Sequence, residues 1–301
     1  MNQSQRIAAV ELMDTMSWRK IAKHLDLPKS TVSDYLREYK QKQESQQGPK
    51  VLFFDVEVSA SVTLAFSRFK AFASPAHVLQ EPYLLMYGYA WGNGNVQIDK
   101  LNDFETDAPN DDQLLVERMW ELLDEADIVI AHNNSFDRGW ANQQFVKYDL
   151  PPPSNYQIVC TLKAAKKAFS LPSNSLAASA QYFDLTRKLS HEGISLWKRC
   201  MEMEDEAFDE MAEYCAGDIV TLQELYRKIL PYIPSHPNHA LYYDDTKRRC
   251  KMCGSDNMEL TGKYYHTTVS KFATWQCGNC GSISRERKSQ VTMKTKPNLL
   301  A

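Results

Sequence analysis

The feature of this sequence that most constrains its fold is an apolar segment that carries two acids. Residues 51–58 read VLFFDVEV, a pattern typical of a strand buried inside a sheet. Asp55 and Glu57 are two positions apart, so in a strand their side chains point to the same face. Burying two carboxylates together is costly unless a cation binds them. The segment therefore indicates either a metal site or, alternatively, a strand end where both acids reach solvent.

Strand-like and helix-like patterns alternate around this segment, over residues 50–230. Residues 83–91 and 96–101 are expected to pair as an antiparallel hairpin around the turn GNGN, and residues 127–131 to form a second buried strand. Helices are expected at 111–125, 135–148, 160–169, 175–183 and 205–230. This order predicts an α/β domain in which a mixed sheet is flanked by helices.

Two further polar motifs lie in this region. Asp137, in the sequence HNNSFD, opens the helix after the second buried strand, where amide groups can orient a substrate. Tyr214 and Asp218 are four positions apart in the last helix and so share one of its faces. Taken alone, this pair is better explained as a core tyrosine beside a solvated acid. The three motifs in this order are more specific than any one of them.

Together the motifs resemble those of the DEDD (DnaQ-like) 3′→5′ exonucleases, which have a ribonuclease H-like fold. That family carries Asp-x-Glu on its first strand, Asn-x-x-(Phe/Tyr)-Asp after a later strand, and Tyr-x-x-x-Asp or His-x-x-x-x-Asp on its final helix. The matching residues here are Asp55, Glu57, Asn133, Phe136, Asp137, Tyr214 and Asp218. Because residue 213 is Glu rather than His, the resemblance is to the tyrosine subclass (DEDDy), over residues 50–230.

The resemblance implies a metal-dependent 3′→5′ exonuclease that hydrolyses phosphodiester bonds of DNA, or alternatively of RNA, and releases nucleoside 5′-monophosphates. It implies two catalytic Mg²⁺ or Mn²⁺ ions, about 3.5–4 Å apart in such sites, bound by Asp55, Glu57, Asp137 and Asp218. One ion would activate a water molecule and the other would stabilise the leaving 3′-oxygen. Tyr214 would position the attacking water.

Four residues near these motifs are candidate substrate contacts. Asn133 and Asn134 are expected to hold the sugar or the backbone of the bound strand, whereas Phe136 is expected to pack in the core. Lys188 and His191 belong to a basic segment, RKLSHEG, within an acidic domain, and are expected to bind phosphates of the strand that is cut. The alternative for that segment is a solvated loop.

The N-terminal residues have an interrupted helical pattern. Helices are expected at 6–13 and 18–25, and a third begins near Ser30 with small polar residues suited to an N-cap. Asp26 takes the turn position where glycine is common, because Asp tolerates a left-handed backbone. Short helices around a tight turn predict a helix-turn-helix module that binds nucleic acid. The alternative is a helical unit that packs on the main domain or docks a partner.

If this module binds DNA, the exposed candidates for contact are Lys29, Ser30, Thr31, Ser33 and Arg37. The polar residues 41–50 are expected to be a linker.

Four of the seven cysteines form two CxxC pairs separated by 23 residues, namely Cys250, Cys253, Cys277 and Cys280. In a reducing compartment such pairs are typical of metal ligands, and four thiolates make a closed tetrahedral site for one structural Zn²⁺. The aromatic, strand-like segment between the pairs predicts a zinc ribbon. The alternatives are a redox dithiol pair or disulfides.

Lys and Arg residues surround these cysteines: Lys247, Arg248, Arg249, Lys251, Lys263, Lys271, Arg285, Arg287 and Lys288. With aromatic residues between them, they suit a nucleic-acid backbone, and the alternative is a ribbon that docks a protein. The charge is divided accordingly: +3 over residues 1–50, −14 over 51–245 and +8 over 246–301. Removing residues 246–301 is therefore expected to weaken substrate binding and flatten its salt dependence.

The expected domains are a helix-turn-helix at 1–45, a ribonuclease H-like exonuclease domain at 50–232, a zinc ribbon at 246–288 and a disordered tail at 289–301. This layout also resembles phage-encoded exonuclease-like proteins. The absence of an 18-residue apolar run or a signal-like N-terminus predicts a cytoplasmic protein, in a bacterial host if phage-encoded. The expected partners are DNA, or RNA, and a replication or repair complex.

Two other functions combine the same kinds of domain. A transposase or integrase can join a helix-turn-helix, a ribonuclease H-like core and a zinc module, but it needs neither Glu57 nor the Tyr214–Asp218 pair. The other alternative is a DNA-binding regulator whose nuclease fold is vestigial. The complete set of acids argues against it, since decay would be expected to remove a costly carboxylate cluster first.

Overall fold

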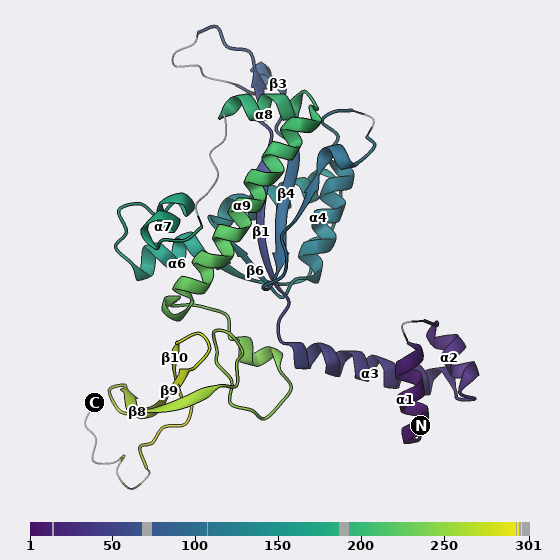
Figure 1. Ribbon diagram of the computed structural model, residues 1–301, viewed down its shortest axis with the longest axis vertical. Coiled ribbons are helices and arrows are strands. Elements are labelled where there is room, and N and C mark those ends of the chain that lie inside the picture. Colours follow the sequence, from purple (N-terminus) through teal and green to yellow (C-terminus); the bar gives the residue numbers. More distant parts are fainter. Residues whose placement is uncertain are drawn as a thin grey trace.

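The computed structural model describes residues 1–13, 15–67, 74–106, 108–186, 193–292, 294 and 296. Three parts follow one another along the chain (Figure 1). We call them the N-terminal helical module, residues 1–47; the central domain, residues 48–233; and the cysteine module, residues 234–292. None of the helices described in these ranges is long and apolar enough to cross a membrane.

The central domain is built on a five-stranded sheet in the order β5-β4-β1-β6-β7. Its strands are β1 (Val51–Val58), β4 (Leu84–Trp91), β5 (Gln97–Lys100), β6 (Ile128–Ala131) and β7 (Gln157–Cys160). Strands β1, β4 and β5 pair antiparallel, whereas β1, β6 and β7 pair parallel, so the predicted mixed sheet and the predicted hairpin are both confirmed. A separate two-stranded sheet joins β2 (Val62–Thr63) and β3 (Val78–Gln80).

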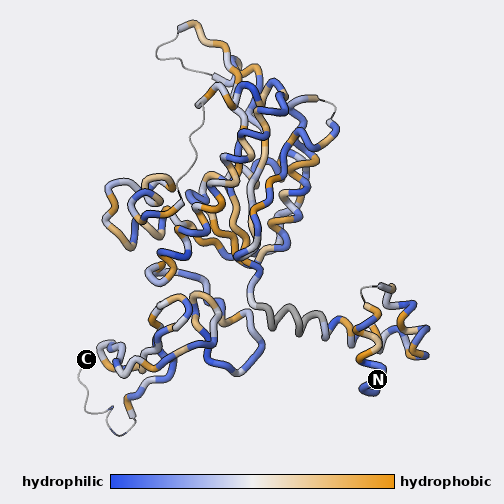
Figure 2. The backbone as a smooth tube through the Cα atoms, viewed as in Figure 1, coloured by the Kyte–Doolittle hydropathy of each residue, from blue (hydrophilic) through white to orange (hydrophobic). Residues whose placement is uncertain are grey.

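Helices cover both faces of the sheet. They are α4 (Gln113–Glu125), α5 (Asn134–Lys147), α6 (Thr161–Ala168), α7 (Leu176–Tyr182), α8 (Ile194–Met201) and α9 (Asp205–Ile229). Alternate residues of β1 enter two cores: Leu52 and Phe54 pack in the same core as residues of α4, while Phe53 packs with residues of α9 such as Ile219. Figure 2 shows the apolar strands between these helices. Asp55 and Glu57 alternate with Phe54, so they share the face of Phe53, against α9.

The N-terminal helical module has the three predicted helices, α1 (Gln3–Leu12), α2 (Trp18–His24) and α3 (Lys29–Gln47). Asp26 has a φ of 53°, which confirms the left-handed turn, and Val32 and Leu36 of α3 are fully buried. The predicted N-cap was wrong, because helix α3 starts after Pro28 without a side-chain cap. The helix continues to Gln47, so most of the expected linker, residues 41–50, is helical. The segment is helical because no Gly or Pro interrupts it before Gly48.

The cysteine module contains a three-stranded antiparallel sheet of β8 (Met258–His266), β9 (Lys271–Cys277) and β10 (Ile283–Arg285). The start of the expected tail is attached to it, because the amide of Gln290 donates to the carbonyl of Lys271 at 2.7 Å. Of the rest of the expected tail, residues 293, 295 and 297–301 lie outside the described residues.

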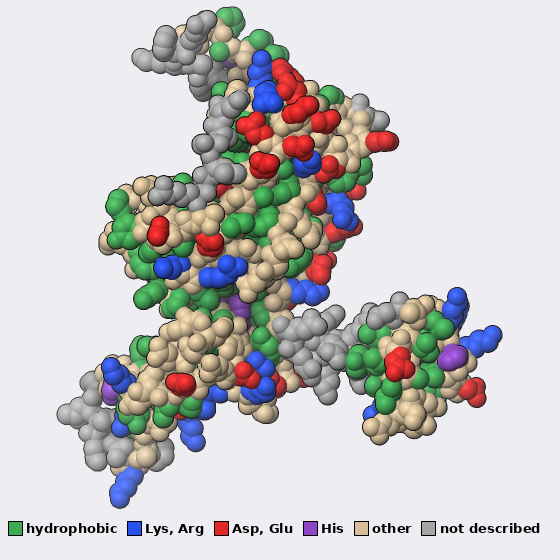
Figure 3. Space-filling view, viewed as in Figure 1, with side chains coloured by type: hydrophobic (Ala, Val, Ile, Leu, Met, Phe, Trp, Pro, Cys, Tyr) green, Lys and Arg blue, Asp and Glu red, His purple; other side chains and the backbone are tan. Residues whose placement is uncertain are grey.

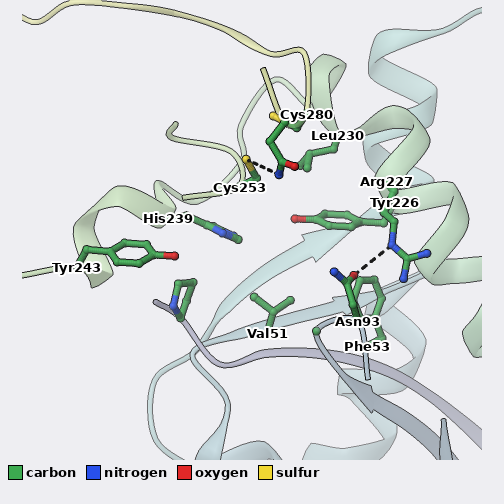
Figure 4. A pocket seen from close by; sticks show the side chains of 13 residues that line it. Val51, Phe53, Asn93, Tyr226, Arg227, Leu230, His239, Tyr243, Cys253 and Cys280 are labelled. Carbon is green, nitrogen blue, oxygen red and sulfur yellow. Dashed lines mark hydrogen bonds between the residues drawn. The ribbon is translucent and has the colours of Figure 1, made fainter. Parts of the chain in front are cut away.

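The cysteine module and the central domain share a core. Cys250, Met252 and Cys277 belong to the same buried cluster as Phe53 and Leu230. A cavity of about 530 Å³ lies at this junction, where residues from β1, α9 and the cysteine module converge (Figure 4). The segment 231–237 joins the two parts and contacts α9: the hydroxyl of Tyr226 lies 2.8 Å from Nε2 of His236.

Candidate active site

The two acids of β1 lie where the pairing of this strand changes. Asp55 is opposite Gly88 of β4, and both Asp55 and Glu57 are half-buried. On the other side, β6 pairs with β1 only as far as Phe53. Beyond that point the backbone of β1 is open to other partners, which allows a side chain from the helix after β6 to reach it.

That side chain belongs to Asp137, in the first turn of α5. The helix begins immediately after β6, because Asn133 takes a left-handed conformation with a φ of 71°. Asp137 Oδ1 accepts a hydrogen bond from the amide of Val56 at 3.4 Å. The side chain is buried, and Oδ2 has no hydrogen-bond partner among the described residues. Burial raises the pKa of Asp137 to about 7, although the amide of Val56 opposes this shift.

Helix α9 supplies the last two predicted residues. Tyr214 and Asp218 are both buried, whereas Glu213 is exposed. The Tyr214 ring lies edge-on to Trp197 of α8, with 6.3 Å between ring centroids. The face of α9 that packs on the sheet therefore carries residues 214 and 218 and turns residue 213 away.

Sequence reasoning missed Cys215, which lies among the acids. Its Sγ atom and one carboxylate oxygen each of Asp55 and Glu57 are within 4.8 Å of one another. Burial raises the pKa of the Cys215 thiol well above its usual value, and the negative charges of Asp55, Glu57 and Asp218 raise it further. Three acids from two elements thus surround one neutral thiol. The signal was available, because Cys215 is three positions before Asp218 on the same helix face.

Gly88 allows α9 to lie close to the sheet at this point. A Cβ atom on Gly88 would meet Cys215 Sγ at 2.8 Å, and side-chain carbons of Ile219 and Ile98 at 3.0 Å. Because Gly88 has no side chain, α9 and its Asp218 can come close to Asp55, the residue opposite Gly88.

We expect Gly88→Ala to destabilise the protein by about 1–3 kcal/mol, because α9 must move outwards. Since Asp218 moves with α9, nuclease activity is expected to fall about 10-fold or more. Gly139→Ala is the control: a Cβ there meets no atom within 4 Å, so helix propensity alone leaves stability unchanged or raises it by up to about 1 kcal/mol. Thermal unfolding and initial rates measure both. Equal behaviour of the two variants would contradict this role of Gly88.

The predicted substrate contacts are less well supported. Asn133 is exposed at the start of α5, the helix that carries Asp137. Asn134 is buried and lines another cavity, of about 330 Å³, with Lys163 and Lys167. Lys188 and His191 lie outside the described residues. The expectation that Phe136 packs in the core was wrong: it is 45% exposed. The first turn of α5 buries Asp137 and therefore turns the preceding residue outwards.

The four cysteines of the CxxC pairs converge on one point. Their sulfur atoms all lie within 4.8 Å of one another, with Cys250 Sγ and Cys280 Sγ 3.6 Å apart and Cys253 Sγ and Cys277 Sγ 3.7 Å apart. Zinc–sulfur bonds of about 2.3 Å in a tetrahedron place the sulfur atoms about 3.8 Å apart. The geometry therefore fits a tetrahedral metal ion and leaves the four cysteines as free thiols rather than disulfides.

Each CxxC pair lies in the same kind of turn. The amides of Gly254 and Gly281 donate to the carbonyls of Cys250 and Cys277, both at 2.9 Å. Both glycines have a φ near 75°, which favours residues without a Cβ atom. This repetition explains why a glycine follows the second cysteine of each pair.

Charge separates the two ends of the molecule. Figure 3 shows Asp and Glu side chains gathered near α8 and the start of α9, and Lys and Arg on the cysteine module. The division predicted from the sequence is thus also a division in space.

Comparisons with known proteins find partial matches. Residues 98–195 match the model of the RNase T family, described as exonuclease, and residues 1–47 match that of a homeodomain-like domain. A 130-residue segment is 30% identical to a PolC-type DNA polymerase III of Oceanobacillus iheyensis, and this match covers 42% of the present chain and 8% of the polymerase. The chain thus spans only a small part of that relative.

Two solved structures are similar at low identity. A family B DNA polymerase of Pyrobaculum calidifontis is 16% identical, with a TM-score of 0.45, over 61% of this chain and 25% of that one. A 3′-exonuclease described with a histone mRNA stem-loop is 11% identical, with a TM-score of 0.32, over 71% of this chain and 86% of that one. The chain thus combines a homeodomain-like helical module with a central α/β domain of ribonuclease H-like fold, part of which, residues 98–195, matches the RNase T exonuclease family.

Proposed function

We propose that this protein is a metal-dependent 3′→5′ exonuclease of the tyrosine subclass that releases nucleoside 5′-monophosphates from DNA. The observation that supports this most strongly is the set of acids in the central domain. Asp55, Glu57, Asp137 and Asp218 come from one strand and two helices, and the buried Oδ2 atom of Asp137 has no hydrogen-bond partner among the described residues. Such an oxygen suits a cation ligand, because an unpaired buried carboxylate is costly.

In this proposal the four carboxylates hold two Mg²⁺ or Mn²⁺ ions. When bound, these ions supply the charge that makes water nucleophilic and stabilises the leaving oxygen. The amide of Val56 orients the Asp137 carboxylate, and the Tyr214 ring packs edge-on to Trp197. In this position the phenol can position the attacking water.

We further propose that Cys250, Cys253, Cys277 and Cys280 bind one structural Zn²⁺. The sulfur spacing and the repeated turns support this assignment. Neighbouring groups also fit thiolates: the side-chain amide nitrogen of Asn279 donates to Cys253 Sγ at 3.6 Å.

For the N-terminal helical module we propose DNA binding through the start of α3. Lys29, Ser30 and Arg37 are exposed, while Thr31 and Ser33 are half-buried. Arg37 forms an exposed ion pair with Asp34 at 3.6 Å, which a phosphate can replace at little cost. In this proposal the N-terminal helical module positions the central domain on DNA during replication or repair.

The proposed activity is tested with a 5′-labelled oligonucleotide, single-stranded or with a duplex end, incubated with Mg²⁺. We expect a ladder that shortens from the 3′ end, and release of mononucleotides. Asp55→Asn is expected to reduce the rate at least about 100-fold, because a metal ligand is lost. Glu213→Gln is the matched control, since Glu213 is exposed on the same helix as Tyr214 and its charge change should leave the rate unaltered.

Other outcomes would reject the proposal. Strand joining without release of mononucleotides would favour the transposase alternative. Tight binding with no cleavage under Mg²⁺ or Mn²⁺ would favour the regulator. Cleavage that persists in Asp55→Asn would show that the acids of β1 are not the catalytic site.

A further inference from the structure

The cysteine module has a groove with an unusual concentration of positive charge. Its volume is about 560 Å³, and it lies between the segment around the first cysteine pair and strands β9 and β10. The cationic residues that line it are Arg248, Arg249, Lys251, Arg285, Arg287 and Lys288. Glu286 is the one acid among the lining residues. The structure therefore collects six of the nine basic residues noted in the sequence into one concave surface.

Two of these cations are used to build the module. Arg249 forms an ion pair with Asp245, donates to the carbonyl of Gly254 at 2.9 Å and stacks on Tyr243, and its side chain is only 13% exposed. Arg248 lies 3.9 Å from the ring centroid of Trp275 and pairs with Glu286 at 3.1 Å. These contacts make both guanidinium groups poor candidates for a test variant.

The one acid that lines the groove, Glu286, is already paired with a cation of the module. The Glu286 carboxylate accepts hydrogen bonds from Arg248 and, at 3.0 Å, from the indole nitrogen of Trp275. By contrast, Lys251, Arg287 and Lys288 are exposed and form no ion pair with any described residue. The charge left in the groove is thus positive, and it favours an anion with several charges over one with a single charge.

We propose that this groove binds the sugar–phosphate backbone of the nucleic-acid strand on which the central domain acts. The choice of a nucleic acid rests on the proposed nuclease function and on two features of the groove. Its cations line one concave surface, which suits several phosphates at once. Arg285 is exposed and lies 4.3 Å from the ring centroid of Phe272, and a guanidinium group beside an aromatic ring suits both phosphates and bases.

The positive charge of the groove also compensates for the net negative charge of the central domain. Residues 51–245 carry a charge of −14, so the net field of this part of the chain disfavours a polyanion. A separate basic surface on the cysteine module, which shares a core with the central domain, provides the attraction that the acidic domain lacks. The function of the groove is therefore retention of the substrate and not hydrolysis.

The test is the binding of a fluorescent single-stranded oligonucleotide to the full chain, followed by anisotropy in buffer without Mg²⁺ or Mn²⁺ at several salt concentrations. We expect the double variant Arg287→Glu/Lys288→Glu to raise Kd about 10-fold or more, and to reduce the slope of log Kd against log salt by about 1–2. The matched control is Lys263→Glu/Lys271→Glu. It changes the charge of the same module equally at exposed positions that do not line the groove.

Melting curves establish that both variants are folded. An equal loss of affinity in the two double variants would overturn the proposal, because net charge alone would then explain binding. So would an unchanged Kd in Arg287→Glu/Lys288→Glu, or binding of an acidic peptide in preference to the oligonucleotide, which would make this a protein-docking surface. Because binding is measured without hydrolysis, failure of the proposed nuclease activity would leave these results interpretable.

Discussion

Asp137→Asn is expected to have opposite effects on activity and on stability. Hydrolysis should fall at least about 100-fold, because the amide cannot replace a carboxylate as a ligand of a divalent cation. In buffer without Mg²⁺ or Mn²⁺, however, the variant should be more stable than the parent by about 1–3 kcal/mol above pH 7, because a buried charge with an unpartnered oxygen has been removed. Initial rates and denaturant unfolding measure the two effects.

The pH dependence of this gain has a definite sign. The pKa of Asp137 is raised from 3.8 to about 7 in the folded protein. The stability contributed by its neutral form is therefore present at low pH and is lost as the pH rises from about 4 to about 7. The advantage of asparagine should grow over that interval and then level off. Added Mg²⁺ should stabilise the parent more than the variant. A variant that is less stable than the parent above pH 7 would contradict this account.

Cys277→Ser is expected to lower the stability of the central domain as well as of the cysteine module. Cys277 is buried in the core that contains Phe53 and Leu230, and loss of one thiolate should release the proposed Zn²⁺ ion, which would stabilise this side of the core. We expect a decrease of about 3 kcal/mol or more in the free energy of unfolding. Zinc content and thermal unfolding followed by tryptophan fluorescence measure the effect.

The matched control for that variant is Cys160→Ser, which changes a half-buried free thiol outside the CxxC pairs. It should retain one zinc per chain and lose little stability. If Cys277→Ser loses zinc but the central domain unfolds as before, the two parts do not share a cooperative core.

The same shared core affects the result expected from removing residues 246–301. Their removal would expose Phe53 and its neighbours, so a loss of affinity would not identify the groove, and point variants are needed.

The sequence predicted the elements with strong periodicity. Strand β1, the hairpin of β4 and β5, and helices α4, α5 and α9 were expected because each has a continuous apolar pattern. Strand β7 and helix α8 were not, since β7 follows a segment with three prolines and α8 follows a polar segment. Short elements such as these are fixed by neighbours in space, β6 for β7 and α9 for α8, which a local pattern does not contain.

Some residues of the candidate site were likewise predicted from the sequence, and others were not. The acids and Tyr214 were predicted because their spacing defines a face of a strand or a helix. Gly88 and Cys215 were not, because their role depends on the contact between α9 and β4. The basic residues of the cysteine module were counted from the sequence as one group. Only the structure separates Arg249, which holds the module together, from Arg287 and Lys288, which face solvent.

The end of pairing between β1 and β6 after Phe53 has a spectroscopic consequence. Beyond this residue, the amide of Val56 is hydrogen-bonded to the Asp137 carboxylate rather than to a neighbouring strand. A cation on that carboxylate would withdraw electron density from the acceptor oxygen and weaken the bond. The amide resonance of Val56 and its rate of hydrogen–deuterium exchange therefore record the occupancy of the acidic site directly, without substrate and without turnover.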